Sequence, residues 1–296
     1  MSDQKYAFVT GASSGIGYAL TESFSKRGYK VFASAPKSEL PALKPLKDKY
    51  GAIIFDCDIT SLEDIIKAKK LVQQTNGGRV DILYNNAGMA TGGPSADIDE
   101  RLLDKIFQVN VLGHINVTKH FIDYVIPYKG TIVFTSSVAS IIPLPWSAAY
   151  NATKAAINMY AKNLHYEMKP FGVSVHSVIT GGVDTHITDD APSHYESKWF
   201  SSEGMEDTIK ACKNMTKDPS QTEQPDVYAE GIANMVTKKN SKFNLYKGGK
   251  SYTIYLVTLL IPLSIIQFFL GFHFKQNKVL SATRKKVLAN DSRKLK

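Results

Sequence analysis

Cysteine is scarce in this chain of 296 residues, which contains only Cys57 and Cys212. Two thiols this far apart supply neither a disulfide framework nor a cluster of metal ligands. We therefore expect a reducing, cytosolic setting and no metal site. A signal-peptide core is also lacking, because Met1–Lys5 leads directly into a strand-like run. With 43% apolar and 21% charged residues, the composition is globular and excludes a disordered or collagen-like chain.

Acidic residues are almost absent from the last fifth of the chain. Residues 238–296 contain 13 lysines and arginines and one acid, Asp291, whereas the preceding residues contain 23 basic and 26 acidic side chains. The net charge of +9 therefore belongs to the carboxyl-terminal tail. Because no zinc-finger or RNA-binding signature accompanies the tail, we expect no nucleic-acid partner.

Short β-branched runs alternate with longer amphipathic stretches over the first 180 residues. This alternation is typical of an α/β fold, with a parallel sheet covered on both faces. Residues 185–224 are less regular and are expected to cover the substrate. The predicted strands span 6–10, 30–35, 52–55, 80–84, 131–135, 173–179 and 243–247, and the predicted helices about 15–28, 38–50, 61–75, 100–124, 148–169 and 225–238.

A glycine-rich turn follows the first predicted strand and precedes a helix. Glycines allow the backbone to turn tightly and approach a pyrophosphate, to which the helix amino terminus offers free N–H groups. The Lys-Ser/Thr ending of a nucleoside-triphosphate loop is absent. The expected cofactor contacts here are Gly11, Ser13, Ser14, Gly15, Ile16 and Gly17.

The same turn matches the Gly-x-Ser-x-Gly pattern of serine hydrolases over residues 11–15. A triacylglycerol lipase with Ser13 as nucleophile is therefore the alternative from a different class. The spacing identifies no acid and histidine that would complete its triad.

The second predicted strand ends without the acid that usually holds the ribose 2′-hydroxyl of NAD. Lys37 follows instead and could meet a 2′-phosphate, so we expect NADP(H) as cofactor. Further expected contacts follow the third and fourth strands, where Asp58 would face the adenine and small or amide residues would face the ribose. The latter are Asn86, Ala87 and Gly88.

Tyr150 and Lys154 are four residues apart in a helical pattern and therefore share one face. A nearby ammonium favours phenolate, so the spacing predicts that the pKa of Tyr150 falls below its usual value of about 10. Ser137, just after the fifth predicted strand, could hydrogen-bond a carbonyl oxygen. Asn110 could hold a water for proton supply.

Together these motifs resemble the classical short-chain dehydrogenase/reductase family over residues 5–247. The resemblance implies a single domain with a Rossmann-type doubly wound parallel sheet. It further implies that Tyr150 is the general acid and Ser137 polarises the substrate carbonyl. Lys154 would hold the nicotinamide ribose and tune Tyr150, while Asn110 would anchor a water relay to Lys154.

One departure from the family follows the sixth predicted strand, where Thr180-Gly181-Gly182 replaces the usual Pro-Gly. The missing proline puts the rigidity of this loop in question. Val183 and Thr185, which by the resemblance contact the nicotinamide, still match the family pattern.

Within the family, residues 113–116, 165–171, 180–182 and the tail are similar to members that reduce a phosphorylated acyl ketone. We therefore expect an NADPH-dependent reductase of a lipid ketone, with a steroid or retinoid ketone as the alternative substrate. Basic residues near the substrate loop could meet a phosphate, namely Lys198, Lys210 and Lys213. The sequence leaves the oligomeric state open, a homo-oligomer included.

Residues 251–274 contain no Lys, Arg, Asp or Glu. One continuous helix of this length would measure about 36 Å, enough to cross a hydrocarbon core of about 30 Å. Pro262 and the basic flanks favour a re-entrant or in-plane membrane anchor instead. We expect a reductase domain at 1–250, a membrane segment at 251–274 and a basic cytosolic tail at 275–296, on the cytosolic face of the endoplasmic reticulum or a lipid droplet.

Overall fold

The computed structural model describes residues 4–189, 191–192, 196–238 and 242–294. Within them, a parallel sheet of seven strands has the order β3-β2-β1-β4-β5-β6-β9. The strands are β1 (Tyr6–Thr10), β2 (Lys30–Ala35), β3 (Ile53–Asp56), β4 (Ile82–Asn85), β5 (Thr131–Thr135), β6 (Ser174–Thr180) and β9 (Asn244–Lys247). The predicted α/β fold is confirmed.

Helices cover both faces of the sheet because the strands carry apolar side chains on each face. One apolar cluster joins the sheet to α1 (Gly15–Lys26), α2 (Lys44–Tyr50) and α8 (Pro225–Val236). A second cluster joins the opposite face to α3 (Leu62–Asn76), α5 (His114–Val125) and α6 (Ala148–Met168). The strand order reverses between β1 and β4, which is where doubly wound sheets bind ligands beyond the strand carboxyl ends.

The helix predicted at 100–124 is interrupted. The structure has α4 (Glu100–Phe107), then a π-helical segment (Gln108–Gly113), then α5. Periodicity alone did not indicate the wider turn, which contains Asn110. Such π-helical turns occur frequently at functional sites.

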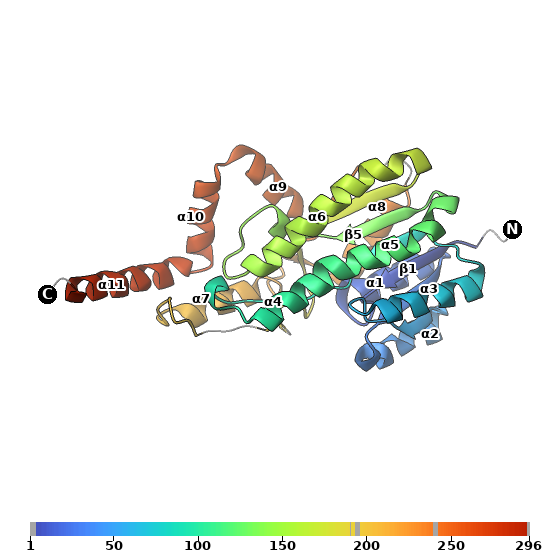
Figure 1. The fold of residues 1–296 in the computed structure, drawn as a ribbon. Helices are drawn as coiled ribbons and strands as arrows, with labels where there is room; N and C mark the ends of the chain where they lie inside the picture. Colours follow the sequence, from blue (N-terminus) through green and yellow to red (C-terminus); the bar gives the residue numbers. More distant parts are fainter. Residues whose placement is uncertain (1–3, 190, 193–195, 239–241, 295–296) are drawn as a thin grey trace.

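The apolar run at 251–274 forms two helices, α9 (Ser251–Leu260) and α10 (Leu263–His273), separated at Ile261–Pro262. The bend expected at Pro262 is present, because proline ends a helix at the residue before it. No helix in the described part of the chain is both long and apolar enough to cross a membrane. In Figure 1 the α9–α10 hairpin projects from the body and α11 (Gln276–Lys294) extends away from it.

Candidate active site

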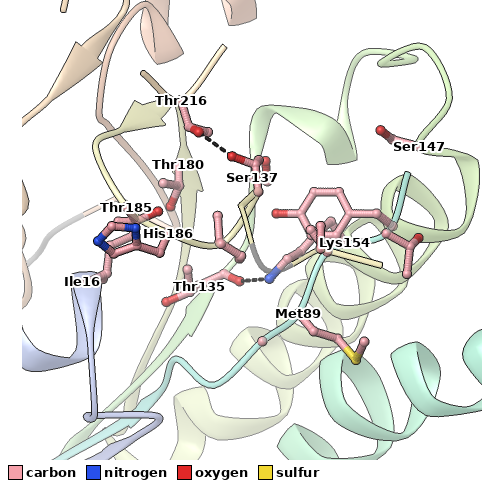
Figure 2. A pocket seen from close by; sticks show the side chains of 18 of the residues that line it. Ile16, Met89, Thr135, Ser137, Ser147, Lys154, Thr180, Thr185, His186 and Thr216 are labelled. Atoms are coloured by element: carbon pink, nitrogen blue, oxygen red, sulfur yellow. Dashed lines mark hydrogen bonds between the residues drawn. The ribbon is translucent and has the colours of Figure 1, made fainter. Parts of the chain in front are cut away.

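A cavity of about 1040 Å³ lies at the switch point and is shown from close by in Figure 2. Its wall extends from the glycine-rich turn to α7 (Met205–Asn214) and the carboxyl-terminal hairpin. Most of the predicted site residues line it. These are Gly11, Ser13, Ser14, Gly15, Ile16, Asp58, Asn86, Ala87, Gly88, Ser137, Tyr150, Lys154, Val183 and Thr185, while Gly17, Lys37 and Asn110 lie outside the wall.

The glycine-rich turn has the shape that a pyrophosphate needs. Gly11 has a φ of +63°, and a Cβ on it would lie 2.7 Å from the Cα of Ala87. A Cβ on Gly17 would lie 2.0 Å from the carbonyl oxygen of Gly11. Side chains are therefore excluded here, and the first N–H groups of α1 face the cavity without a side-chain cap from Ser14. The residues present fit a dinucleotide.

Asn86 holds this turn in place from the neighbouring strand. Its Nδ2 donates to the carbonyl oxygens of Thr10 (3.2 Å) and Gly11 (3.1 Å), and its Oδ1 accepts from the hydroxyl of Thr135 (3.2 Å). The side chain is thus engaged in positioning the loop, while the residue still lines the cavity.

The contact predicted between Lys37 and a 2′-phosphate stays a prediction. Lys37 is exposed and lies outside the cavity wall, whereas Ser38 and Glu39 line it. The hydroxyl of Ser13 donates to the Glu39 carboxylate at 2.5 Å. Ser13 is thus paired with a carboxylate rather than with the imidazole that a hydrolase nucleophile requires.

Lys154 and Tyr150 occupy the middle of the cavity wall. The ammonium of Lys154 donates to the carbonyl oxygen of Thr135 at 2.9 Å (Figure 2). The same ammonium lies 5.6 Å from the centre of the Tyr150 ring. Ser137 lies close enough to the Tyr150 hydroxyl to lower the pKa of that tyrosine. Ser137 is fixed in turn, because its Oγ accepts from the backbone N–H of Ala139 at 3.1 Å.

The predicted lowering of the Tyr150 pKa is wrong for this structure. Burial raises the pKa of Tyr150 above its ordinary value, and the nearby Ser137 hydroxyl offsets only part of that effect. Burial also lowers the pKa of Lys154 to about 8. Desolvation disfavours the charged form of each group and outweighs the attraction between phenolate and ammonium that the spacing suggested.

The fully buried Asn110 binds the segment that follows β4. Its Oδ1 accepts from the backbone N–H of Met89 and its Nδ2 donates to the carbonyl of Met89, both at 2.9 Å. The same Nδ2 donates to Thr153 on α6 at 3.1 Å. Asn110 therefore ties the π-helical segment to the catalytic helix, and the water relay stays a prediction.

His114 supports the cavity wall from outside, a role that sequence reasoning missed. It is fully buried and its Nε2 lies 2.7 Å from the carbonyl oxygen of Ala87. Burial and the charge of Lys154 lower its pKa to about 3, so the imidazole is neutral. With Nε2–H donating to Ala87, it holds the loop beneath the cavity. The sequence carried no signal for this role, because the π-helical segment that precedes His114 is visible only in the structure.

The loop that departs from the family pattern is held by backbone contacts. Gly182 and Gly249 exchange hydrogen bonds of 3.1 and 2.7 Å, and β7 (Gly182–Val183) pairs with β8 (Thr222–Glu223). A Cβ on Gly182 would lie 2.2 Å from the carbonyl oxygen of Gln221. Close backbone packing thus replaces the missing proline as a source of rigidity.

The far end of the cavity brings together α6, α7 and the carboxyl-terminal segment. The Trp146 indole N–H donates to the hydroxyl of Thr208 at 3.0 Å, and that hydroxyl donates to the carbonyl of Phe274. Of the lysines predicted near the substrate, Lys213 lines the cavity, whereas Lys198 and Lys210 are exposed outside its wall. Two other lysines line the wall, Lys105 and Lys250, and no sequence pattern predicted them as site residues.

The family described as short chain dehydrogenase matches residues 5–196. The chain is similar to the NADPH-dependent 1-acyldihydroxyacetone phosphate reductase of Saccharomyces cerevisiae, with 35% identity over 290 residues and 97% of both chains covered. It is 37% identical over 188 residues to the reductase of the same name from Schizosaccharomyces pombe, covering 63% of this chain and 62% of that one. These similarities agree with the sequence motifs.

Solved structures share the fold. A short-chain dehydrogenase from Streptomyces avermitilis superposes with a TM-score of 0.77 at 26% identity, covering 94% of this chain and 98% of that chain. An alcohol dehydrogenase from Thermococcus sibiricus, complexed with 5-hydroxy-NADP, has a TM-score of 0.67 at 22% identity, with 83% and 97% covered.

Proposed function

The chain belongs to the short-chain dehydrogenase family, and from this premise we propose that it is an NADPH-dependent reductase of a lipid ketone. The observation that carries the proposal is the placement of Tyr150, Ser137 and Lys154 on the cavity that also contains the glycine-rich turn. Catalytic groups and a dinucleotide cradle thus face one space. NADPH, when bound there, supplies the hydride.

In this proposal Tyr150 gives its hydroxyl proton to the ketone oxygen as that oxygen gains charge. Its raised pKa keeps the phenol protonated at neutral pH, which a general acid requires. Ser137 donates a hydrogen bond to the same oxygen and orients it. Lys154, which is cationic below about pH 8, holds the ribose and favours the phenolate that Tyr150 leaves behind.

The proposed substrate is 1-acyldihydroxyacetone phosphate, reduced to 1-acylglycerol 3-phosphate on the route to phosphatidic acid. Two relatives carry the name of a reductase for this substrate. In support, Lys105, Lys213 and Lys250 on the cavity wall could meet the phosphate. Steroid and retinoid ketones lack that charge and are the alternative substrates.

The domain division at residue 250 and the location on a membrane belong to the same proposal. A water-insoluble substrate favours an enzyme held at the cytosolic face of the endoplasmic reticulum or of a lipid droplet. Residues 251–274, which form the projecting hairpin, would provide the attachment.

The experiment is to follow NADPH oxidation by the full chain with acyldihydroxyacetone phosphate, a keto-steroid and retinal side by side. We expect turnover of the phosphorylated lipid and a loss of roughly 100-fold or more in Tyr150→Phe, with NADPH binding retained. Turnover of the steroid or retinal alone would support the reductase chemistry but contradict the proposed substrate. A Tyr150→Phe variant with wild-type rates would refute the catalytic assignment.

A further inference from the structure

Exposed apolar side chains are concentrated on the α9–α10 hairpin. Among the described residues, 24 large apolar side chains are exposed by more than a third, and eleven of these lie between Tyr252 and Phe272. Leu260 and Phe272 are 78% and 74% exposed. A contiguous apolar surface of this kind marks a binding site for a partner or a lipid.

The charges around the hairpin identify its partner. No Asp or Glu occurs between Glu230 and Asp291, whereas Lys250 and Lys275 flank the hairpin and Arg284–Lys286 follow on α11. All of these cations are exposed. An anionic lipid leaflet supplies both an apolar interior and negative head groups, and basic residues next to an apolar segment bind such a surface. A neutral or basic protein surface would lack the complementary charge.

The lengths of the two helices limit how deeply they insert. At 10 and 11 residues, α9 and α10 measure about 15 and 17 Å, roughly half of a hydrocarbon core. The bend at Pro262 returns the chain to the side from which it came (Figure 1). The hairpin therefore suits shallow insertion, with both basic flanks at the head groups.

The base of the hairpin is also part of the cavity wall. Ile254 on α9 and Phe274 after α10 line the same cavity as Tyr150. Phe274 is buried, and its carbonyl is bonded through Thr208 to Trp146, which lies just before the catalytic helix α6. The hairpin is thus attached to the body at the wall of the cavity that contains Tyr150.

We propose that the α9–α10 hairpin docks on an anionic lipid leaflet and that the ketone substrate reaches Tyr150 directly from that leaflet, past Ile254 and Phe274. The proposal rests on the proposed reductase function and adds the surface and the route. An acyl chain then stays in an apolar environment from the leaflet to the cavity. The enzyme need not wait for the lipid to dissolve in water.

Docking is tested by flotation of the full chain with vesicles of phosphatidylcholine, with and without phosphatidylserine. The test variant carries Leu259→Asp and Leu260→Asp at the hairpin tip, and the control is Val227→Asp on α8, where the side chain is 52% exposed. Wild type and control should float with the phosphatidylserine vesicles, and the tip variant should not. Flotation of the tip variant, or equal flotation of wild type on both vesicles, would overturn the proposal. A wild-type dimer that the tip variant dissociates would identify a second copy as the partner instead.

The route is tested with a long-chain acyldihydroxyacetone phosphate in vesicles and a short-chain, water-soluble analogue. The tip variant should lose roughly tenfold or more in turnover of the long-chain ketone, because its local concentration at the surface is lost. Its turnover of the short-chain ketone should match wild type. Equal loss on both substrates would overturn the route. Wild type that reduces neither ketone but still floats would refute the reductase function and leave docking standing.

Discussion

Lys154 and Tyr150 lie one helical turn apart, and burial shifts their pKa values in opposite directions. The lysine titrates at about 8, whereas the tyrosine stays protonated beyond its ordinary range. Reduction needs the phenol as a proton donor and the ammonium as a cation. The pair is therefore in the required state below about pH 8.

We accordingly predict that kcat/KM for ketone reduction falls as the pH rises through about 8, where Lys154 loses its proton. A pH–rate profile with the short-chain ketone measures this. Lys154→Met should lose most of the activity, and its pH–rate profile should lack the fall near pH 8. A wild-type profile that remains flat to pH 10 would contradict the assignment.

His114 yields a prediction about stability. Its pKa is about 3 in the folded state against about 6.5 in an unfolded chain, so only the unfolded chain takes up the proton between these values. Its contribution to stability is therefore complete above about pH 6.5 and falls as the pH drops towards 3, by about 1.4 kcal/mol per pH unit at most.

Denaturant unfolding between pH 7 and 4 tests the role of His114. His114→Gln keeps a donor for the Ala87 carbonyl but cannot titrate, so its stability should fall less steeply with acid. His273→Gln, which changes an exposed imidazole, is the control and should follow wild type. Parallel curves for all three proteins would disprove the role.

Irregular elements shape the catalytic cavity more than the regular ones do. The π-helical segment places Asn110 against Met89 and Thr153, and the pairing of β7 with β8 holds the loop that contributes Val183 to the cavity wall. Both elements are fixed by contacts between segments far apart in the chain. A change at such a contact should affect the whole element.

Gly182→Ala tests this at the loop, because the added Cβ would meet the carbonyl oxygen of Gln221 at 2.2 Å. We expect a loss of about 1–3 kcal/mol in the free energy of unfolding, together with weaker NADPH binding. Gly77→Ala is the control, since a Cβ there meets no atom within 4 Å although φ is +75°. It should cost about 1–2 kcal/mol and leave NADPH binding unchanged. If Gly182→Ala and Gly77→Ala had equal effects on NADPH binding, the loop at Gly182 would not be part of the cofactor site.

Across the whole molecule, charge and apolar exposure separate by region. The first 237 residues carry 23 basic and 26 acidic side chains, whereas residues 238–296 carry 13 basic side chains and one acid, so all of the excess positive charge lies in the tail. The body that contains the cavity and the surface proposed to dock on lipid thus differ in net charge. Conditions that screen charge should affect docking without affecting the chemistry.

Flotation on phosphatidylserine vesicles should therefore weaken as salt rises from 0.1 to 1 M, since the screening length shortens from about 10 to about 3 Å. Turnover of the short-chain ketone at the same salt concentrations is the internal control and should change much less. Flotation that is insensitive to salt would show that the apolar tip binds without help from the lysines and arginines.

The sequence by itself determined the features that depend on local order. Strand and helix periodicity predicted the parallel sheet, the glycines predicted the turn at 11–17, and the four-residue spacing placed Tyr150 and Lys154 on one helix face. Pro262 likewise predicted the bend in the apolar run. These features arise from neighbours within a few residues, and a local pattern encodes them directly.

Only the tertiary structure decided which distant residues share the cavity and how deeply each is buried. It placed Glu39 rather than Lys37 on the wall, bonded Asn110 to Met89, and brought Ile254 and Phe274 to the cavity that Tyr150 also lines. It also reversed the expected shift of the Tyr150 pKa. Desolvation depends on everything packed around a group, and residues far apart in the chain supply that packing.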